Sequence, residues 1–557
     1  YINDIVDLSP HALRGRKRGG WWLCWVIVSL TCISVERRSR KSTVIFTVVA
    51  FHAVRLVSAG CLRHTGGMDL LDNFIVAAGD LLWTWAVLPV LAVLGLYFTL
   101  RSGVVQFRLI PEMFRTLTNR TPRDENGVPQ SVSAFQAFTI SAASRVGVGN
   151  IAGVGTAIAI GGPGAVFWMW TMAFIGGASS FVESTLGQLF KVRDKDGFRG
   201  GPAYYMQHGL KARWMGVLFA IILILCFPFA FSSLQANTIS ATVSASFGGE
   251  IAWIPWLIGI VLAILTGLVI FGGLRRIANV TQAVVPAMAL SYLLLGLVIV
   301  GMNIERLPEV FASIYTQAFG INEVVGATLG VIIMTGVKRG MFSNEAGLGS
   351  APNAGASAAV THPVKQGLVQ TLGVYFDTFL VCSITAFIIL VSTPDLANAT
   401  RGIGLTQNAI VSNLGEWANV LLSIIIFLLA FSSILGNYYY GESNIEFISA
   451  HPRVRQVYRV LVVVVIFVGS IASADIIWNT ADGIMGIMAL VNLIAIGLLS
   501  GLVFKLLRNY SRQRKDGLEP VFVRDMLPGV AGIQCWEDEL SVTGPISTQT
   551  ASKRRGK

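Results

Sequence analysis

The sequence predicts an all-α protein that crosses a membrane about eleven times, and three observations lead to this prediction. Of the 557 residues, 54% are apolar and only 13% are charged, whereas soluble globular proteins carry about 25% charged residues. The mean hydropathy is +0.65. Apolar runs of about 18 residues or more recur along most of the chain, and each is long enough to span a bilayer as a helix. The composition therefore excludes a string of soluble domains.

The first 67 residues differ from the rest of the chain. They contain no methionine, begin at Tyr1, and hold ten basic residues against three acidic ones. Their apolar runs, Trp21–Ile33 and Val44–Val54, are too short to span a bilayer and do not form a normal signal peptide. Two interpretations remain: a non-native stretch ahead of a true start at Met68, which we favour, or a basic N-terminal extension.

From Met68 onward, hydrophobicity predicts eleven membrane segments. They are residues 82–100, 133–160, 163–190, 214–245, 251–272, 278–303, 322–340, 364–392, 414–442, 457–474 and 479–507. The first lies in an N-terminal region, 68–132, that also contains a basic loop. Residues 509–557 are polar and charged, which predicts a cytoplasmic, partly disordered tail.

Loop charges predict the orientation of these segments. With residues 68–81 placed outside, the alternating loops put nineteen Lys and Arg residues inside and two outside, Arg306 and Arg401. Basic residues concentrate in cytoplasmic loops, so we expect the N-terminus outside and the C-terminus inside. The net charge of +12 is explained in the same way, and nucleic-acid binding is not expected.

The composition also argues against an enzyme or a metalloprotein. The six cysteines show no CxxC spacing and the six histidines form no HExxH motif. No set of a nucleophile and a base appears within the segments. We therefore expect no catalytic residues and no cofactor.

The segment 133–160 carries polar chemistry at membrane depth. It contains four closely spaced glycines, Gly147, Gly149, Gly153 and Gly155. Gly149 and Gly153 form a GxxxG packing motif, but packing does not explain Asn150 and Arg145 beside them, because buried polar groups in lipid are costly. A dinucleotide-binding loop is excluded because no strand precedes it. A discontinuous helix, whose freed amides and carbonyls bind a carboxylate and a cation, explains the pattern better.

Three ordered motifs carry a family resemblance. They are VGVGNIAGV (146–154), GGPGAVFWMW (161–170) and GVKRGMFSNEAGLGSAP (336–352). Over about Met68–Arg508 the chain resembles the alanine/glycine:cation symporters, also called sodium:alanine symporters. The resemblance implies a leucine-transporter-like fold in a bacterial-type plasma membrane, with one extra N-terminal helix followed by inverted five-helix repeats at 133–303 and 322–508.

The resemblance also implies where the substrate and one sodium ion bind. In this fold the unwound part of the first core helix carries a Gly-x-Gly-Asn motif. Here the amides of Gly147, Val148 and Gly149 would face the substrate carboxylate. The side chain of Asn150 would bind a sodium ion.

A second sodium site is implied by two distant stretches of sequence. The carbonyls of Ala143 and Val146 match its backbone ligands, and Ser432 and Ser433 match its hydroxyl ligands. Two adjacent serines in a helix can also bond back to the preceding turn. Hard oxygen ligands suit a hard cation such as Na⁺, so we favour sodium binding.

Other polar residues of the segments are assigned less specifically. Gln136 and Thr139 are expected to line the inner vestibule and contact substrate, and Glu183 to brace an unwound segment. Asn344 and Glu345 could gate, bind or cap a resumed helix. We assign no role to Asp377 or Glu442. These residues complete the set of candidates for the transport site.

Two residues depart from the family pattern. Arg145 replaces a small or hydroxyl residue, and Asn437 replaces a tryptophan found in many members. An asparagine in place of a large apolar wall would let the pocket accept a longer polar side chain, such as that of glutamine.

The resemblance thus implies sodium-coupled import of small neutral amino acids by alternating access, of the alanine/glycine class and with glutamine as a further candidate. The expected partners are the amino acid, Na⁺ and the lipid bilayer. Alternatives are a proton-coupled or ion-independent exchanger, in which Arg145 replaces a sodium charge, and a channel or passive facilitator. The sequence leaves open the substrate, the stoichiometry and the oligomeric state.

Overall fold

The computed structural model describes residues 77–544, apart from residues 125, 196, 248–250, 321–327, 395, 397–401 and 473. The predicted extension 1–67, the predicted start at Met68 and residues 545–557 of the tail lie outside the described residues.

The described elements are almost all helical. The first half comprises η3 (Trp83–Val87), α4 (Leu88–Arg101), α5 (Val105–Arg108), α6 (Ile110–Leu117), α7 (Ala134–Arg145), η4 (Gly149–Gly153), α8 (Val154–Gly161), α9 (Gly164–Leu189), β1 (Val192–Asp194), β2 (Gly197–Arg199), α10 (Pro202–His208), α11 (Arg213–Ile224), η5 (Leu225–Phe231), α12 (Ser232–Ser246), α13 (Ile254–Ile270) and α14 (Gly273–Met302).

The second half is also almost entirely helical. It comprises η6 (Ile304–Arg306), α15 (Leu307–Ala318), α16 (Leu329–Asn344), α17 (Ala351–Ser357), α18 (Pro363–Tyr375), η7 (Phe376–Cys382), α19 (Ser383–Val391), α20 (Ile403–Leu414), α21 (Trp417–Ile448), α22 (Pro452–Ile471), α23 (Ala474–Lys515), η8 (Arg524–Met526) and α24 (Glu539–Thr543).

Local sequence explains where several helices begin. Ser133 and Gln136 form a reciprocal capping box at the start of α7, which satisfies two otherwise unpaired backbone donors. α18 and α22 each begin with a proline in the first turn, preceded by a capping histidine, His362 or His451.

The all-α membrane fold is confirmed. Among the described residues, eight helices are long and apolar enough to cross a membrane, or nine with the bent pair of α7 and η4–α8. Each of the eleven predicted segments coincides at least in part with a helix. Two of these helices are short, however: α13 has 17 residues and α16 has 16. The count of about eleven spans therefore stays a prediction.

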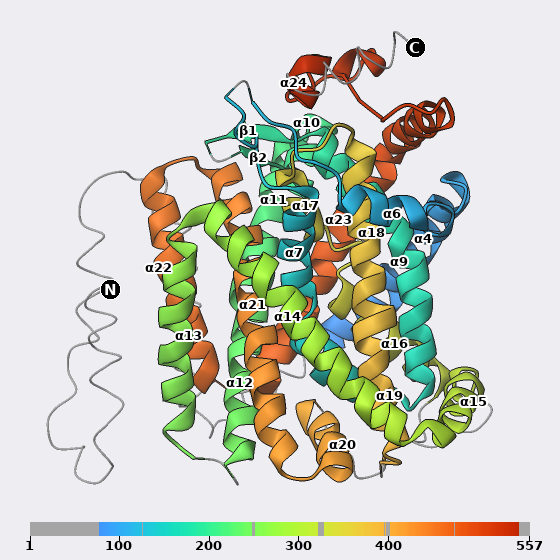
Figure 1. The fold of residues 1–557 in the computed structure, drawn as a ribbon, viewed down its shortest axis with the longest axis vertical. Coiled ribbons are helices and arrows are strands. Elements are labelled where there is room, and N and C mark those ends of the chain that lie inside the picture. The colour runs from blue at the N-terminus through green and yellow to red at the C-terminus, as the bar shows by residue number, and fades with distance from the viewer. Residues whose placement is uncertain are drawn as a thin grey trace, which may run out of the picture. The chain divides into compact units, whose positions relative to one another are not determined.

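The two halves place a broken helix at corresponding positions. α7 and α8 are followed by α9, α11–α12, α13 and α14, and α16 and α17 are followed by α18–α19, α21, α22 and α23. α9 packs against α16 and α18, while α7 packs against α14 and α21. The tail, α10 and the β1–β2 hairpin lie at one end of the bundle, and α15 and α20 at the other (Figure 1). The repeat bounds 133–303 and 322–508 stay a prediction.

The charge count assumed that Lys338 and Arg339 lie in a loop, and this is wrong. Both are inside α16, and Arg339 is only 9% exposed. Arg339 donates to both carboxylate oxygens of Asp482 at 3.3 and 2.6 Å, and Lys338 Nζ lies 3.1 Å from the same group. The ion pairs let the helix continue past the basic residues at which the predicted segment ended. Without these two, seventeen of the nineteen inside charges remain.

Candidate functional site

The helical path breaks between Arg145 and Gly149. Val146 has a ψ of 87°, and α7 and the helix that resumes at Gly149 meet at 51°. Gly147 approaches its neighbours too closely for a side chain, because a Cβ there would lie 2.2 Å from the Ser433 hydroxyl. A break inside a membrane segment presents free backbone groups to ligands. The predicted discontinuous helix is confirmed.

Two amides at this break are held by side-chain oxygens. The Gly147 N–H donates to Asn150 Oδ1 at 2.9 Å, and the Val148 N–H donates to Gln235 Oε1 at 3.1 Å. Gln235 lies on α12 and is 3% exposed. Its oxygen occupies a position that a carboxylate oxygen could take. Gln235 was not among the residues predicted from the sequence, although a glutamine within an apolar segment was a usable signal.

Asn150 contacts a buried acid. Its Nδ2 donates to Asp377 Oδ1 at 2.6 Å, and Asp377 Oδ2 accepts from Ser343 Oγ at 2.8 Å and Thr378 Oγ1 at 3.1 Å. All four side chains are fully buried. Because Asp377 lies in η7 and Ser343 in the last turn of α16, this cluster joins both broken helices. From the sequence, Asp377 was a polar residue without an assigned role.

Ser433 meets the two carbonyls predicted for the second sodium site, and Ser432 does not. The Ser433 hydroxyl lies 2.8 Å from the Ala143 oxygen and 3.4 Å from the Val146 oxygen. Both hydroxyls also donate to the Leu429 carbonyl, at 2.9 Å from Ser432 and 3.0 Å from Ser433, and the other contact of Ser432 is with Met288 Sδ at 3.1 Å. A thioether is a poor ligand for a hard cation. Sodium binding stays a prediction for both serines, and the geometry favours Ser433.

The second broken helix is braced by Glu183. Glu345 lies in the left-handed region with φ of 57°, and α16 ends before it. Glu183 of α9 accepts from the amides of Gly347 at 3.3 Å and Gly349 at 3.0 Å. Asn344 Oδ1 accepts from the Ala346 N–H at 3.0 Å. Glu183 thus braces the second break, and Asn344 caps backbone beside it.

Asn437 lies next to the turn that precedes the first break. Its Oδ1 is 2.7 Å from the Ser144 hydroxyl, which also lies 2.6 Å from Glu345 Oε1. Ser350 donates to the other oxygen of Glu345 at 2.6 Å. This chain of contacts connects α21 with both breaks. The predicted contact between Asn437 and substrate stays a prediction.

Gln136 and Thr139 lie at the beginning of α7. Gln136 caps the helix, and its Nε2 donates to Asn279 of α14 at 3.3 Å. The Thr139 hydroxyl donates to the Gln136 carbonyl at 2.9 Å and is fully buried. Both residues thus have hydrogen-bond partners within the protein, and their contact with substrate stays a prediction.

Arg145 is 2% exposed and lacks a full set of partners. Its Nη1 donates to the Gln370 carbonyl at 3.1 Å, while Nε and Nη2 have no hydrogen-bond partner among the described residues. Within that part of the chain it forms no ion pair within 4.0 Å. It therefore places a positive charge beside the first break without a carboxylate in direct contact.

An aromatic layer covers the break on the side of α16. A Cβ on Gly149 would lie 2.9 Å from the Phe342 ring, whose centroid is 4.6 Å from that of Phe231 and 5.2 Å from that of Trp478. The Arg339 guanidinium lies 5.0 Å from the Trp478 ring centre. The breaks are thus closed to solvent on this side.

Comparisons with known proteins give consistent assignments. The family model described as the sodium:alanine symporter family matches residues 68–524. The amino-acid carrier protein AlsT of Bacillus subtilis is 50% identical over 471 residues, which cover 85% of this chain and 99% of AlsT. The probable sodium/glutamine symporter GlnT of the same organism is 47% identical, covering 84% of this chain and 96% of GlnT.

One solved structure, that of MhsT in complex with L-phenylalanine, aligns with a TM-score of 0.49 at 11% identity, covering 78% of this chain and 99% of that chain. The family model spans most of the chain, and the relatives share half or nearly half of their residues with it. The chain therefore belongs to the sodium:alanine symporter family.

Proposed function

We propose that the protein is a secondary active transporter that imports a small neutral amino acid together with Na⁺ by alternating access. The observation that carries the proposal is the convergence of Ser433 on the Ala143 and Val146 carbonyls at a broken helix. Three oxygens from two helices make a partial cage for a desolvated cation. The amides of the next two residues, Gly147 and Val148, donate to the side-chain oxygens of Asn150 and Gln235, which a carboxylate could replace.

The substrate carboxylate would bind at the first break. It would displace Gln235 from the Val148 N–H and accept that hydrogen bond itself. The displaced Gln235 amide remains able to donate to the same carboxylate, since its Nε2 lies 3.0 Å from where a Cβ of Gly147 would be. Residue 147 has to be glycine, because a side chain there would collide with Ser433 and Gln235.

The coupling ions would occupy two places. Asn150 would bind one sodium ion, and the carboxylate of Asp377, 2.6 Å from Asn150 Nδ2, would supply a compensating charge. Ala143, Val146 and Ser433 would hold the other. In a low-dielectric site a cation needs such compensation. Arg145 would oppose ion binding by repulsion.

The alanine/glycine class follows from the family, and one observation favours glutamine as a further substrate. GlnT, a probable sodium/glutamine symporter by its name, is among the relatives. Asn437 presents an amide to Ser144 beside the break. The plasma membrane, with the N-terminus outside and the C-terminus inside, agrees with the seventeen remaining basic charges.

Uptake by proteoliposomes tests the proposal. Labelled alanine, glycine and glutamine are offered with an inward Na⁺ gradient, with an inward proton gradient, and with neither. We expect accumulation above equilibrium with Na⁺ alone. Accumulation with an inward proton gradient alone would support the proton-coupled alternative, uptake only in exchange for amino acid loaded inside would support the ion-independent exchanger, and equilibration without accumulation would support a facilitator.

A further inference from the structure

The segment 516–544, which we call the strap, follows α23 and lies at the end of the bundle that carries α10 and the β1–β2 hairpin (Figure 1). Its two largest aromatic side chains are buried: Phe522 is 0% and Trp536 is 1% exposed, whereas Leu518, Met526 and Leu540 are exposed. A polar tail without a docking site would leave such side chains in water. The strap is therefore packed against the transporter body.

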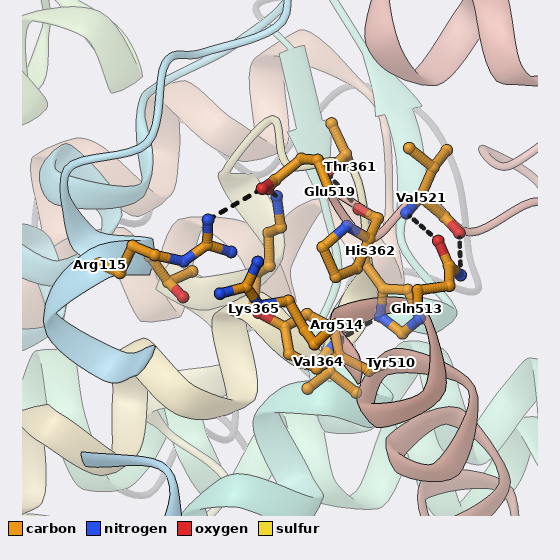
Figure 2. Close-up of polar contacts among 12 residues, drawn as sticks. Arg115, Thr361, His362, Val364, Lys365, Tyr510, Gln513, Arg514, Glu519 and Val521 are labelled. Carbon is orange, nitrogen blue, oxygen red and sulfur yellow. Dashed lines mark hydrogen bonds and ion pairs between the residues drawn. The ribbon is translucent and has the colours of Figure 1, made fainter. Parts of the chain in front are cut away.

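The first anchor of the strap lies on the connection between α17 and α18. The Phe522 N–H donates to the Thr361 carbonyl at 2.9 Å, and the Thr361 hydroxyl donates to the Pro520 carbonyl at 2.8 Å. Beside them, Glu519 binds Lys365 of α18 and, at 3.0 Å, Arg115 of α6 (Figure 2). Glu519 thus ties two elements of the body to the strap.

The second anchor lies at the end of α9. The Trp536 indole N–H donates to the Gln188 carbonyl at 3.2 Å. The Lys191 ammonium lies 4.5 Å from the Trp536 ring centre and 4.0 Å from that of Phe198 in β2. Cation–π contacts of this kind strengthen when they are desolvated, and Lys191 is 2% exposed.

The third anchor lies ahead of α7. Gln130 donates to the Ser541 carbonyl at 3.0 Å. The next residues join the two broken helices: Ser131 donates to the Ser357 carbonyl at 2.7 Å, and the Ala359 N–H donates to the Val132 carbonyl at 3.0 Å. The strap therefore contacts the same ends of α7 and α17 that close the bundle at this face.

We propose that the strap is a latch on the inner gate: docked, it holds the ends of α7, α9 and α17–α18 together, and it must loosen before the site opens toward the tail side. This inference concerns gating and goes beyond the substrate and the ion. A route from the breaks to this face requires the joined ends of α7 and α17 to separate. The first and third anchors bind residues next to these ends. The second anchor binds the carbonyl of Gln188 in α9, whose side chain donates to the Gly355 and Ala358 carbonyls at the end of α17.

Three thiol reporters, one in the strap and two in α7, test the latch. Cys535, native and 5% exposed, lies in the strap and reports its undocking. Thr139→Cys and Ala137→Cys, at fully buried positions on different faces of α7, report opening of the gate. The purified full chain in nanodiscs is treated with a thiol reagent, and mass spectrometry quantifies the labelling of each cysteine. Neither reporter requires alanine or Na⁺ to be the transported pair, so failure of the latch and failure of the proposed function are distinguishable.

Two variants of the strap, Glu519→Gln and Trp536→Ala, should label faster both at Cys535 and at the engineered α7 cysteines. For a fast opening equilibrium the labelling rate follows the open population. Glu519→Gln should raise it about two- to fivefold, the effect of losing a partly exposed ion pair. Trp536→Ala should raise it about tenfold or more, because it empties a buried aromatic site. Asp525→Asn, the same charge change at an exposed acid of the strap, should leave both rates unchanged.

Two results would overturn the latch. One is faster labelling of Cys535 with unchanged labelling of both α7 reporters, because the strap would then undock without opening the gate. The other is unchanged labelling of Cys535 in Trp536→Ala, because the strap would then not be held by that anchor.

Discussion

The Ser433 hydroxyl lies 2.8 Å from the carbonyl oxygen of Ala143, a residue 290 positions earlier in the chain. The contact joins the middle of α21 to the last turn before the first helix break. In a hydroxyl with two lone pairs, donation to a carbonyl leaves an acceptor free. If the Ser433 O–H turns away from the Ala143 carbonyl, the hydroxyl oxygen and the carbonyl oxygen can both coordinate a cation.

Ser433→Ala is expected to weaken apparent Na⁺ affinity about ten- to a hundredfold. Loss of one contact to a charged group costs about 1.5–3 kcal/mol. Ser432→Ala is the matched control, since its hydroxyl shares the contact with the Leu429 carbonyl but otherwise contacts Met288 and not the two carbonyls at the break, and it should shift the Na⁺ curve little. The measurement is alanine uptake against Na⁺ concentration. A larger shift in Ser432→Ala than in Ser433→Ala would reverse the assignment.

Asp377→Asn should reduce Na⁺-driven uptake more strongly than either serine variant. It removes a full negative charge next to Asn150 while keeping the size of the side chain. Thr378→Val serves as the control, because it removes a neutral hydroxyl that contacts the same carboxylate at 3.1 Å. Unchanged Na⁺ dependence in Asp377→Asn, with normal protein levels in the membrane, would exclude a role in ion binding.

The sequence predicted the helical fold and the first break well, for a physical reason. Clustered glycines next to Asn150 are costly in a lipid-embedded helix, so they marked the break locally. The contact of Ser433 with Ala143 followed from the resemblance, because nothing local in α21 distinguishes Ser433 from Ser432. Helix rotation separates these neighbours by about 100°, and only the packing of α21 on α7 decides which one faces the break.

Contacts between distant segments escaped the analysis. Gln235 and Asp377 each appeared as one polar residue in an apolar run, and their partners, Val148 and Asn150, lie far away in sequence. Lys338 and Arg339 looked like a loop because their partner Asp482 is over 140 positions later. A buried charge is costly without a counterion, so a sequence pattern places such a residue in a membrane helix only when its partner is also recognised.

Glutamine should compete with labelled alanine for uptake. The amide of Asn437 lies beside the first break and can pair with the amide of a longer substrate. Asn437→Trp should abolish the competition while keeping alanine uptake, and Asn437→Leu separates loss of the amide from loss of space. If glutamine does not compete with wild type, or still competes with Asn437→Trp, the pocket assignment is wrong.

Asp482→Asn should destabilise the folded protein by about 3 kcal/mol. It leaves Arg339 and Lys338 without a carboxylate that both contact, and breaking a buried ion pair has a cost of about this size. Asp80→Asn is the control, since Asp80 is mainly exposed and lies 3.7 Å from Lys338. The free energy of unfolding in detergent is compared for the two variants. Equal losses would show that burial of the pair contributes nothing.

Docking of the strap should be lost in acid. Burial alone would raise the pKa of Glu519, but Lys365 and Arg115 outweigh it, and the pKa is lowered from 4.5. A lowered carboxyl pKa stabilises the docked state above about pH 4.5, and this contribution disappears as the pH falls through the lowered value.

Acrylamide quenching of Trp536 measures this docking, taken as the difference between wild type and Trp536→Phe. We expect weak quenching from pH 8 down to about pH 5 and stronger quenching below about pH 4, over the range in which the Glu519 carboxylate takes up its proton. Glu519→Gln should be quenched more strongly than wild type at neutral pH and should lack most of the acid step. An acid step of full size in Glu519→Gln would assign the step to another group, because the glutamine amide does not titrate.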